Sequence, residues 1–387
     1  MTGRERTLRI VLVCEAAGGG VGKHVLDIAE SLPSLGFDVL LVYSARRAEP
    51  QFAARLAQHA RHGYRVAVVD VDRAPGPRDF SGVLQLRRAV REFGGADILH
   101  GHSSKGGALA RLARWGCARR VFYTPNAFYA QAPSLRSSVR RLYGLAERAL
   151  ALATDCVITV SSDEMQFART LGIPDSKLAV IENGISLRTD AAVARDRATA
   201  RAALGLPDDQ VVIGFVGRLV AQKSPELAVE TFARVRRSHG NAHFVLVGDG
   251  PLAPTVTQAL AKHGVAGDTT WMRDGVGRDL LPAVDVLLVS SQYEGFSYVM
   301  LEGLDAGCAI VTTPVGGARD CVVHGSNGAV VEATPDELSS AVEHFIESPD
   351  TLHRARAVSR ARAHHFAIER MIDRLASLYR NAVDNAA

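Results

Sequence analysis

Short apolar runs alternate with amphipathic segments along most of the chain, from residue 8 to about 180 and again from 211 to about 331. Residues 8–13, 211–216 and 284–290 are nearly continuous apolar runs of strand length. Such runs are typical of parallel strands buried on both faces, and the segments between them have the spacing of one-sided helices. The alternation predicts an α/β protein made of two doubly wound units.

Two further segments predict how the units are connected. Residues 186–209 are polar and rich in Ala and Arg, which indicates a linker followed by an entry helix, and residues 366–383 have helical spacing. A chain of 387 residues also exceeds one typical hydrophobic core. We therefore expect domains over residues 1–185 and 186–365, with a C-terminal helix over about 366–387.

The composition is that of a soluble globular protein, with 47% hydrophobic and 22% charged residues. No run reaches the ~18 uninterrupted apolar residues of a membrane span, and the first residues lead into an apolar strand rather than a signal peptide. The five cysteines have no metal-ligand spacing, so we expect them to be reduced and structural. These features predict a cytoplasmic protein.

The most informative motif is a pair of glutamates, Glu294 and Glu302, separated by seven residues. An apolar strand precedes the pair and a helical pattern follows it, so Gly295, Phe296 and Ser297 are expected at a helix start, where unpaired N–H groups can seat a phosphate. At ~1.5 Å per residue, eight helical steps span on the order of 10 Å. This spacing suits a nucleotide-sugar, although two glutamates at this distance also occur on ordinary exposed helices.

A second motif places two cations after the strand over residues 211–216. Arg218 and Lys223 lie on the loop that leaves this strand. Arg offers a planar fork and Lys a point charge, so the pair can close on a pyrophosphate. The alternative is two solvated cations at the start of a helix.

Together these motifs resemble the E-x7-E element and the preceding Arg/Lys loop of retaining GT-B glycosyltransferases, in particular glycosyltransferase family 4. The strand and glycine turn over residues 244–251 fit the same order, and the resemblance covers essentially the whole chain. It implies two Rossmann-like domains facing a central cleft, the first for the acceptor and the second for a nucleotide-sugar, with the last helix packing back on the first. It also implies that Glu294 faces the donor sugar, that Glu302 binds the ribose hydroxyls, and that Arg218 and Lys223 bind the diphosphate.

A glycine-rich loop follows the first strand. A Walker A loop would need Gly at Ala17 and Ser or Thr at His24, and a Rossmann fingerprint would need a glycine at Lys23, so neither motif is present. The loop does resemble the Gly-Gly turn of family 4, which faces the cleft near the donor phosphates and sugar. The resemblance therefore adds Gly19 and Gly20 to the donor-binding residues.

Two polar loops are expected beside the reacting centre. His100 and His102 alternate along an extended segment, so we expect them on opposite faces with only one facing the cleft. Family 4 often has a His after Thr-Pro in the next loop, where this chain has Asn126. An amide cannot take up a proton near neutral pH, so Asn126 is limited to a positional role. We expect His102 and Asn126 to border the reacting centre.

Charge is shared unevenly between the halves. Residues 1–180 hold 25 Lys and Arg against 16 Asp and Glu, a balance of +9, whereas the remainder holds 20 against 25. One helical segment has arginines on one side (Arg136, Arg140, Arg141, Arg148) and apolar residues on the other (Leu135, Val139, Leu142, Tyr143, Ala146, Leu150). The apolar side is expected to pack on the core, with the arginines either in water or against an anionic membrane or lipid pyrophosphate. No recognition motif or aromatic interleaving accompanies the charge, so nucleic acid is not predicted as a partner.

The segment Asp70-Val71-Asp72 resembles the metal-binding DxD of the other glycosyltransferase fold. It ends a predicted strand over residues 66–71 and is followed by a Pro-rich loop, where carboxylates are commonly solvated. No metal and no cofactor are assigned.

The sequence therefore predicts a metal-independent retaining glycosyltransferase of hexosyltransferase type. Its donor would be a UDP- or GDP-sugar and its acceptor a hydroxyl, on a polyprenyl-diphosphate-linked saccharide used for exopolysaccharide or cell-envelope glycan. Such an acceptor would place the enzyme on the inner face of the cell membrane. A GT-B nucleotide-sugar 2-epimerase and a non-catalytic nucleotide-sugar-binding subunit remain as alternatives.

Overall fold

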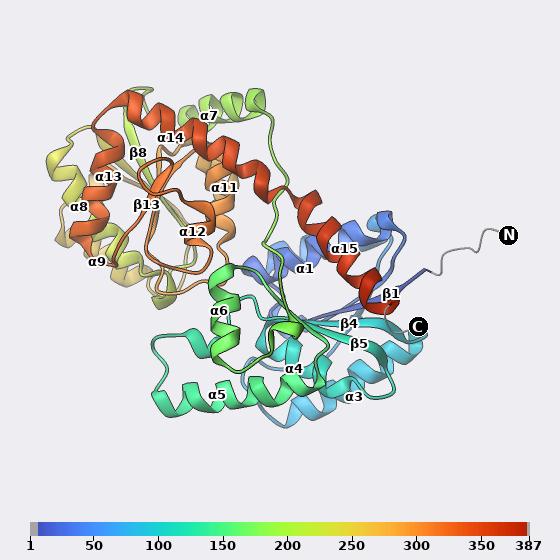
Figure 1. Cartoon of the computed structure of the whole chain (residues 1–387). Helices are drawn as coiled ribbons and strands as arrows, with labels where there is room; N and C mark the ends of the chain where they lie inside the picture. The colour runs from blue at the N-terminus through green and yellow to red at the C-terminus, as the bar shows by residue number, and fades with distance from the viewer. Residues whose placement is uncertain (1–6, 385–387) are drawn as a thin grey trace. The chain divides into compact units, whose positions relative to one another are not determined.

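The computed structural model describes residues 7–384, which divide into two compact units (Figure 1). The first unit runs to Asn183 and also includes the C-terminal segment from Ile368, and the second is Gly184–Ala367. Each unit has its own parallel sheet with helices on both faces, as the alternation of apolar and amphipathic segments predicts.

The first unit contains a seven-stranded sheet in the order β3-β2-β1-β4-β5-β6-β7. Its strands are β1 (Arg9–Cys14), β2 (Asp38–Tyr43), β3 (Arg65–Val68), β4 (Ala96–His102), β5 (Ala118–Thr124), β6 (Cys156–Thr159) and β7 (Leu178–Val180). All pairs are parallel. The predicted strand over residues 66–71 is thus three residues shorter at its end, because β3 stops at Val68.

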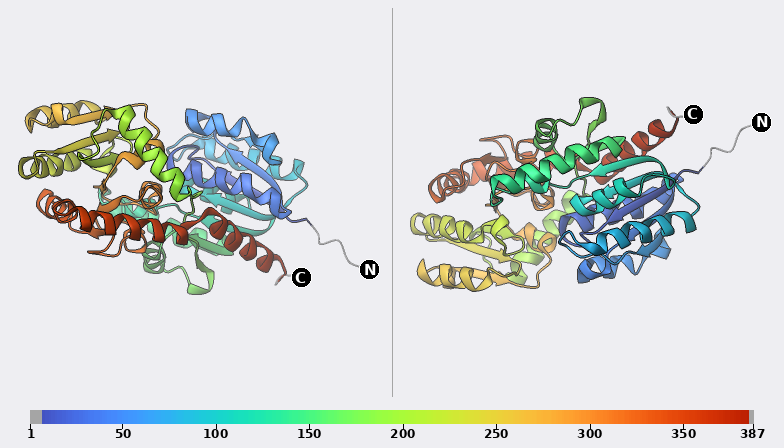
Figure 2. Two further views of the ribbon diagram at one scale, coloured as in Figure 1. Left: turned by 90° about the horizontal axis from the view of Figure 1, so that it is seen from above. Right: turned by 90° about the horizontal axis from the view of Figure 1, so that it is seen from below.

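The helices of the first unit follow the strands in turn. They are α1 (Gly19–Ser31), α2 (Pro50–Leu56), α3 (Pro77–Glu92), α4 (Ser103–Ala113), α5 (Ser137–Leu150), α6 (Ser162–Thr170) and the C-terminal α15 (Ile368–Asp384). α15 buries Met371, Ile372, Leu375 and Tyr379 in the same core as α1 and the strands (Figure 2). Its apolar stripe therefore makes the end of the chain part of the first unit.

The second unit contains a six-stranded parallel sheet in the order β10-β9-β8-β11-β12-β13. The strands are β8 (Val211–Val216), β9 (Ala242–Val247), β10 (Thr269–Met272), β11 (Val286–Val289), β12 (Ala309–Thr312) and β13 (Gly328–Val330). The helices are α7 (Asp190–Leu204), α8 (Pro225–Ser238), α9 (Ala253–Lys262), α10 (Gly277–Leu280), α11 (Tyr298–Ala306), α12 (Ala318–Cys321), α13 (Pro335–Ile346) and α14 (Pro349–Ala363).

Each sheet reverses its strand order once. In the first unit the reversal lies between β1 and β4, and in the second between β8 and β11. Loops leaving the carboxyl ends of two such strands run to opposite faces and leave room for a ligand between them. The predicted fold class, α/β with two doubly wound Rossmann-like domains, is confirmed.

Candidate active site

The strongest cluster of candidate residues lies at the strand-order reversal of the second unit. Arg218 and Lys223 follow β8, and Glu294 follows β11, its neighbour in the sheet. Parallel strands end at the same edge, so residues 71 positions apart in the chain meet there. The structure thus brings Lys223 and Glu294 together.

Lys223 and Glu294 form an ion pair. Their side chains are only 18% and 11% exposed. The Ser291 Oγ also donates a hydrogen bond of 2.8 Å to the Glu294 Oε1. A partly buried carboxylate next to a cation is a suitable arrangement for contacting a sugar hydroxyl and a phosphate at adjacent positions.

The loops that carry this pair are tied to each other by backbone contacts. The Ser290 Oγ donates to the carbonyls of Lys223 and Ser224, at 2.9 and 3.0 Å. The Gln292 N–H donates to the Gln222 carbonyl at 2.7 Å. These bonds hold the β8 and β11 loops in one register, so the position of the ion pair is set by backbone as well as by side chains.

The glycine turn after β9 packs directly against the β8 loop. Gly248 and Gly250 have φ values of +128° and +156°, which strongly favour glycine. A Cβ on Gly248 would lie 2.1 Å from the Gly217 carbonyl oxygen, and one on Gly250 would lie 2.6 Å from that of Leu219. The predicted glycine turn therefore supports the loop that carries Arg218.

Arg218 differs from Lys223 in having an uncommitted side chain. It is exposed, and among residues 7–384 its guanidinium has no ion pair or hydrogen bond. An exposed guanidinium beside the reversal can bind an anionic ligand without first breaking an internal contact.

The E-x7-E segment starts its helix later than predicted. α11 begins at Tyr298 with Ser297 as the preceding cap residue, so residues 294–297 form a loop and eight helical steps do not separate the glutamates. The Phe296 ring is 5% exposed, packs 5.5 Å from the Phe366 ring, and lies where a Cβ on Gly317 would be. Phe296 is therefore a core residue whose ring packs inside the second unit rather than facing a ligand. Glu302 lies on α11 and is half-buried.

The glycine loop of the first unit already has an internal carboxylate at its helix start. The Gly19 N–H donates a 2.8 Å hydrogen bond to the Glu49 Oε2. The Glu49 side chain also occupies the position of a Cβ on Gly18, so a larger residue there would displace this carboxylate. Gly19, at φ +53°, and Gly20 are exposed. A phosphate could use the Gly19 amide only by displacing Glu49.

The prediction that His100 and His102 face opposite ways is wrong. Their ring centroids are 4.0 Å apart, because side chains alternate with a period of two and residues two apart share a face. His100 lies 2.5 Å from the Tyr379 hydroxyl and 2.8 Å from Thr124 Oγ1. His102 is fully buried, and neither of its ring nitrogens has a hydrogen-bond partner among the described residues.

Burial lowers the pKa of both histidines well below the usual value of 6.5. The nearby His24 lowers both pKa values further, and His100 also lowers that of His102. The His24 ring is 5.4 Å from the His102 ring. His102 is therefore neutral at pH 7 and lies enclosed where β4 ends and α4 begins. Contact with a ligand would require this segment to move.

Asn126 lies on a strained turn after β5. Asn126 and the following Ala127 have φ values of +54° and +91°. Non-glycine residues in this region cost on the order of 1–3 kcal/mol each and are retained where surrounding contacts hold them. The Asn126 Nδ2 donates only a long 3.3 Å bond to the Thr124 carbonyl, so its amide can still turn toward a ligand.

Asp70 and Asp72 are engaged with arginines. Asp70 pairs with Arg46, and Asp72 pairs with Arg78 at 2.8 Å. The Arg46 pair lowers the pKa of the Asp70 carboxyl. Within residues 7–384 no group of three or more His, Cys, Asp or Glu is arranged to hold a metal ion.

The orientation of α5 also differs from the prediction. Leu142 and Leu145 are 66% and 59% exposed, and Ala146 is exposed as well, so the expected packing of Leu142 and Ala146 on the core is wrong. The reason is Glu147, which is buried by an ion pair of 2.7 Å with Arg111. With Glu147 turned inward, Leu142, Leu145 and Ala146 lie on the exposed side of α5, whereas Val139, Tyr143 and Leu150 are half-buried. The helix itself lies on an outer face of the first unit (Figure 2).

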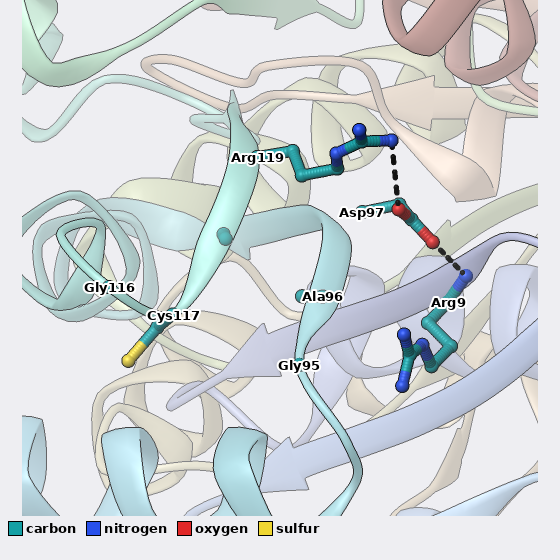
Figure 3. A pocket seen from close by; sticks show the side chains of 8 residues that line it. Arg9, Gly95, Ala96, Asp97, Gly116, Cys117 and Arg119 are labelled. Carbon is teal, nitrogen blue, oxygen red and sulfur yellow. Dashed lines mark hydrogen bonds and ion pairs between the residues drawn. The ribbon is translucent and has the colours of Figure 1, made fainter.

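A pocket of about 350 Å³ lies elsewhere, at the amino ends of β1, β4 and β5 (Figure 3). Arg9 and Arg119 flank Asp97, which is buried and accepts a 2.9 Å hydrogen bond from the Arg9 backbone N–H. This is the sheet edge opposite to the carboxyl ends of the strands. The pocket therefore lies away from the residues that the motifs predict for the donor.

Comparison with protein families gives matches to both units. Residues 18–189 match the model described as Glycosyltransferase Family 4, and residues 196–364 match the model described as Glycosyl transferases group 1. D-inositol 3-phosphate glycosyltransferases are similar over most of the chain. The Thermobispora bispora protein is 25% identical over 95% of this chain and 90% of its own length, and the Acidothermus cellulolyticus protein is 29% identical over 94% and 86%.

Solved structures agree with the fold. Anabaena HepE in complex with UDP and glucose has a TM-score of 0.81 at 19% identity, over 97% of this chain and all of that one. Sucrose-phosphate synthase from Thermosynechococcus elongatus also has a TM-score of 0.81 at 19% identity, over 98% of this chain and all of that one.

The architecture is that of a GT-B glycosyltransferase. With both units matched by its family models, the chain belongs to glycosyltransferase family 4, as the motifs predicted.

No helix among the described residues is long and apolar enough to cross a membrane.

Proposed function

We propose that this protein is a retaining glycosyltransferase that moves a hexose from a nucleoside-diphosphate donor to a hydroxyl acceptor. The observation that carries the proposal is the ion pair of Lys223 with Glu294 beside the uncommitted Arg218, at the strand-order reversal of the second unit. This is where an open α/β sheet binds its ligand. The solved neighbours include complexes with UDP and with UDP-glucose, which supports a UDP-sugar as the donor.

In this proposal, Arg218 and Lys223 stabilise the departing diphosphate together with the backbone N–H groups of residues 295–297. Glu294 orients the donor sugar through its hydroxyls, and Glu302 binds the ribose. Charge that develops on the leaving oxygen is thereby offset by fixed cations and dipoles. The acceptor proton passes to the leaving phosphate, so no protein base is required. Asn126 borders the reacting centre through its amide, and His102 supports the start of α4 from within the core.

Turnover of a donor panel tests this function against its two alternatives. The purified protein is incubated with UDP-, GDP- and ADP-sugars, with release of nucleoside diphosphate and the fate of the sugar measured. Slow hydrolysis of one donor, with the sugar configuration at C2 unchanged, is expected of a glycosyltransferase. An altered C2 would identify the epimerase, and thermal stabilisation without any turnover would identify a binding subunit.

Activity is expected to survive EDTA. Two protein cations and the loop N–H groups of residues 295–297 neutralise the diphosphate in the proposed mechanism, and Asp70 and Asp72 are already paired with arginines. The rate of donor turnover should therefore change by less than about twofold after chelation, since no step uses a metal ion. Loss of activity in chelator that manganese restores would instead assign a metal to the site.

The acceptor is proposed to be a lipid-linked saccharide at an anionic membrane. α5 supports this, because exposed Leu142 and Leu145 lie beside exposed Arg141 and Arg148, the pattern of a helix that rests in a lipid interface. The names of the similar D-inositol 3-phosphate glycosyltransferases favour a small phosphorylated polyol as the second candidate acceptor.

Vesicle sedimentation tests whether the protein binds an anionic membrane, as expected for a lipid-linked acceptor but not for a soluble one. We expect binding to vesicles rich in anionic lipid that declines with salt, since each cation near such a surface contributes ~1 kcal/mol. Exchanging Arg141 and Arg148 for Glu should abolish it, and Leu142→Asp should weaken it. The charge-matched exchange of Arg88 and Arg91 on α3 is the control and should change it far less. Equal sedimentation of all variants would favour the soluble acceptor.

A further inference from the structure

The turn between β5 and the next helical segment is held in an unfavourable backbone conformation. Asn126 and Ala127 are consecutive non-glycine residues at positive φ, +54° and +91°. Alanine gains nothing from such a conformation, since its Cβ makes the left-handed region less favourable than it is for glycine. A neighbouring group must therefore stabilise the turn.

That group is Glu164, the third residue of α6. Its Oε1 accepts a 2.7 Å hydrogen bond from the Ala127 N–H, and its Oε2 accepts one of 2.8 Å from the Val160 N–H. The Glu164 side chain is fully enclosed, at 1% exposure. Its own backbone N–H donates to the Oγ of Ser161, which fixes the start of α6. One oxygen thus completes the helix cap, and the other reaches a turn 37 residues away.

Among residues 7–384, the packing on either side gives Glu164 no cationic partner. Glu147 on α5 forms an ion pair of 2.7 Å with Arg111 from α4. It also accepts a hydrogen bond of 3.1 Å from the Tyr123 hydroxyl of β5. Burial raises the pKa of the Tyr123 hydroxyl well above 10, so it stays neutral. Asp163 precedes Glu164 on its own helix. The two backbone N–H groups are therefore the contacts that stabilise the Glu164 carboxylate.

We propose that Glu164 is a positioning residue that holds the Asn126–Ala127 turn in the conformation in which the Asn126 amide meets the bound sugar. This inference rests on the proposed function, including the positional role proposed there for Asn126. Glu164 contacts no substrate. It acts through the backbone of Ala127, one residue from the functional amide.

The proposal makes activity depend on pH near neutrality. Burial raises the pKa of the Glu164 carboxyl to about 7 from its ordinary 4.5, against the lowering effect of the two backbone N–H groups, and Glu147 adds to the rise. The ionised carboxylate accepts both hydrogen bonds. A protonated carboxyl carries a hydrogen on one oxygen, and the hydrogen bond that this oxygen accepts from the backbone is weakened or lost. The turn is therefore held above about pH 7 and released as the pH falls through 7, and kcat should fall with it.

The free energy of unfolding is expected to change with pH in the opposite direction to kcat. Since the folded-state pKa lies above the unfolded one, ionisation of Glu164 lowers the free energy of unfolding as pH rises from about 4.5 to about 7. Removing the charge should therefore remove this pH dependence, so the free energy of unfolding of Glu164→Gln should not fall between about pH 4.5 and 7 as that of the wild type does.

Glu164→Gln is the primary test. It retains the shape but places an NH₂ against one of the two N–H donors at every pH. We expect kcat at pH 8 to fall about tenfold with little change in donor KM, and the acid limb of the pH profile near 7 to disappear. Asp163→Asn removes the same charge from the same helical turn and should leave both unchanged. An unaltered kcat and pH profile in Glu164→Gln would overturn the proposal.

Ala127→Gly supplies a rescue. Glycine adopts φ of +91° without the penalty that alanine incurs, so the turn should depend less on the carboxylate. The double variant Glu164→Gln/Ala127→Gly should recover at least half of the lost kcat on a logarithmic scale. A double variant as slow as Glu164→Gln alone would mean that the carboxylate acts in some way other than through the turn.

Hydrogen exchange gives a readout that needs no turnover. In the wild type, the amide protection of a peptide spanning residues 122–132, corrected for intrinsic rates, should decrease as pH falls from 8 to 6, and Glu164→Gln should lack protection throughout. If no donor is turned over, the proposed function fails while this measurement still decides whether Glu164 holds the turn. Equal, pH-independent protection in the two proteins would contradict it.

Discussion

Glu294→Gln is expected to lower kcat by on the order of 10²-fold, the scale seen when one preorganised polar contact to a reacting centre is lost. Glutamine keeps the volume of the side chain and can still accept from Ser291 Oγ. It lacks the negative charge that pairs with Lys223 and orients the donor sugar. Rates from single-turnover measurements with saturating donor should show the loss, with donor KM changed much less.

The control is Glu337→Gln, which removes an exposed carboxylate from the first turn of α13 in the same unit. It should leave kcat unchanged. Wild-type kcat in Glu294→Gln would remove Glu294 from the reaction.

Lys223→Met should reduce kcat/KM by on the order of 10²–10³-fold, because the cation proposed to meet the leaving diphosphate is lost. The effect has a second cause in the structure. Glu294, 11% exposed, would be left without its cation and would repel the incoming diphosphate. Steady-state kinetics at subsaturating donor measures the loss.

Lys223→Arg is the matched variant for charge. It should retain much more of kcat/KM than Lys223→Met, since it preserves both the ion pair and a phosphate contact. If the two variants were equally impaired, the shape of the lysine rather than its charge would be the important feature.

The fold could be predicted from the sequence because parallel strands buried on both faces consist of nearly continuous apolar residues. The runs over 211–216 and 284–290 predicted β8 and β11 closely, and the cations and Glu294 follow these strands directly. Once two such strands are neighbours in a parallel sheet, their carboxyl ends must coincide. The family resemblance had assigned both residues to the donor site, and the neighbouring strands of the structure add the ion pair between them.

The missed residues depend on contacts between distant parts of the chain. Glu49 meets Gly19 across 30 residues, and Glu164 meets Ala127 across 37, with no local pattern to mark either carboxylate. Ser291 could have been found, since it is a polar residue directly after a buried strand and three before Glu294. The two histidines were misplaced through the strand period itself, which puts residues two apart on one face.

A helical wheel also could not predict the orientation of α5. The wheel treats leucines as inward-facing, but a buried ion pair between Glu147 and Arg111 rotates this helix so that Leu142 faces out. A charged residue is rarely buried unless it is paired, and the partner lay 36 residues earlier in the chain. Pairing of this kind becomes visible only when the helices are placed.

Calorimetric titration of the whole protein with UDP, GDP and ADP in the presence of EDTA tests the central claim most directly. The account predicts that one of these nucleoside diphosphates binds at a single site, and that Arg218→Ala weakens this binding at least about tenfold, since it removes an uncommitted guanidinium from the phosphates. Absence of binding by all three, or equal affinity in the wild type and Arg218→Ala, would contradict a donor site at the carboxyl ends of β8 and β11.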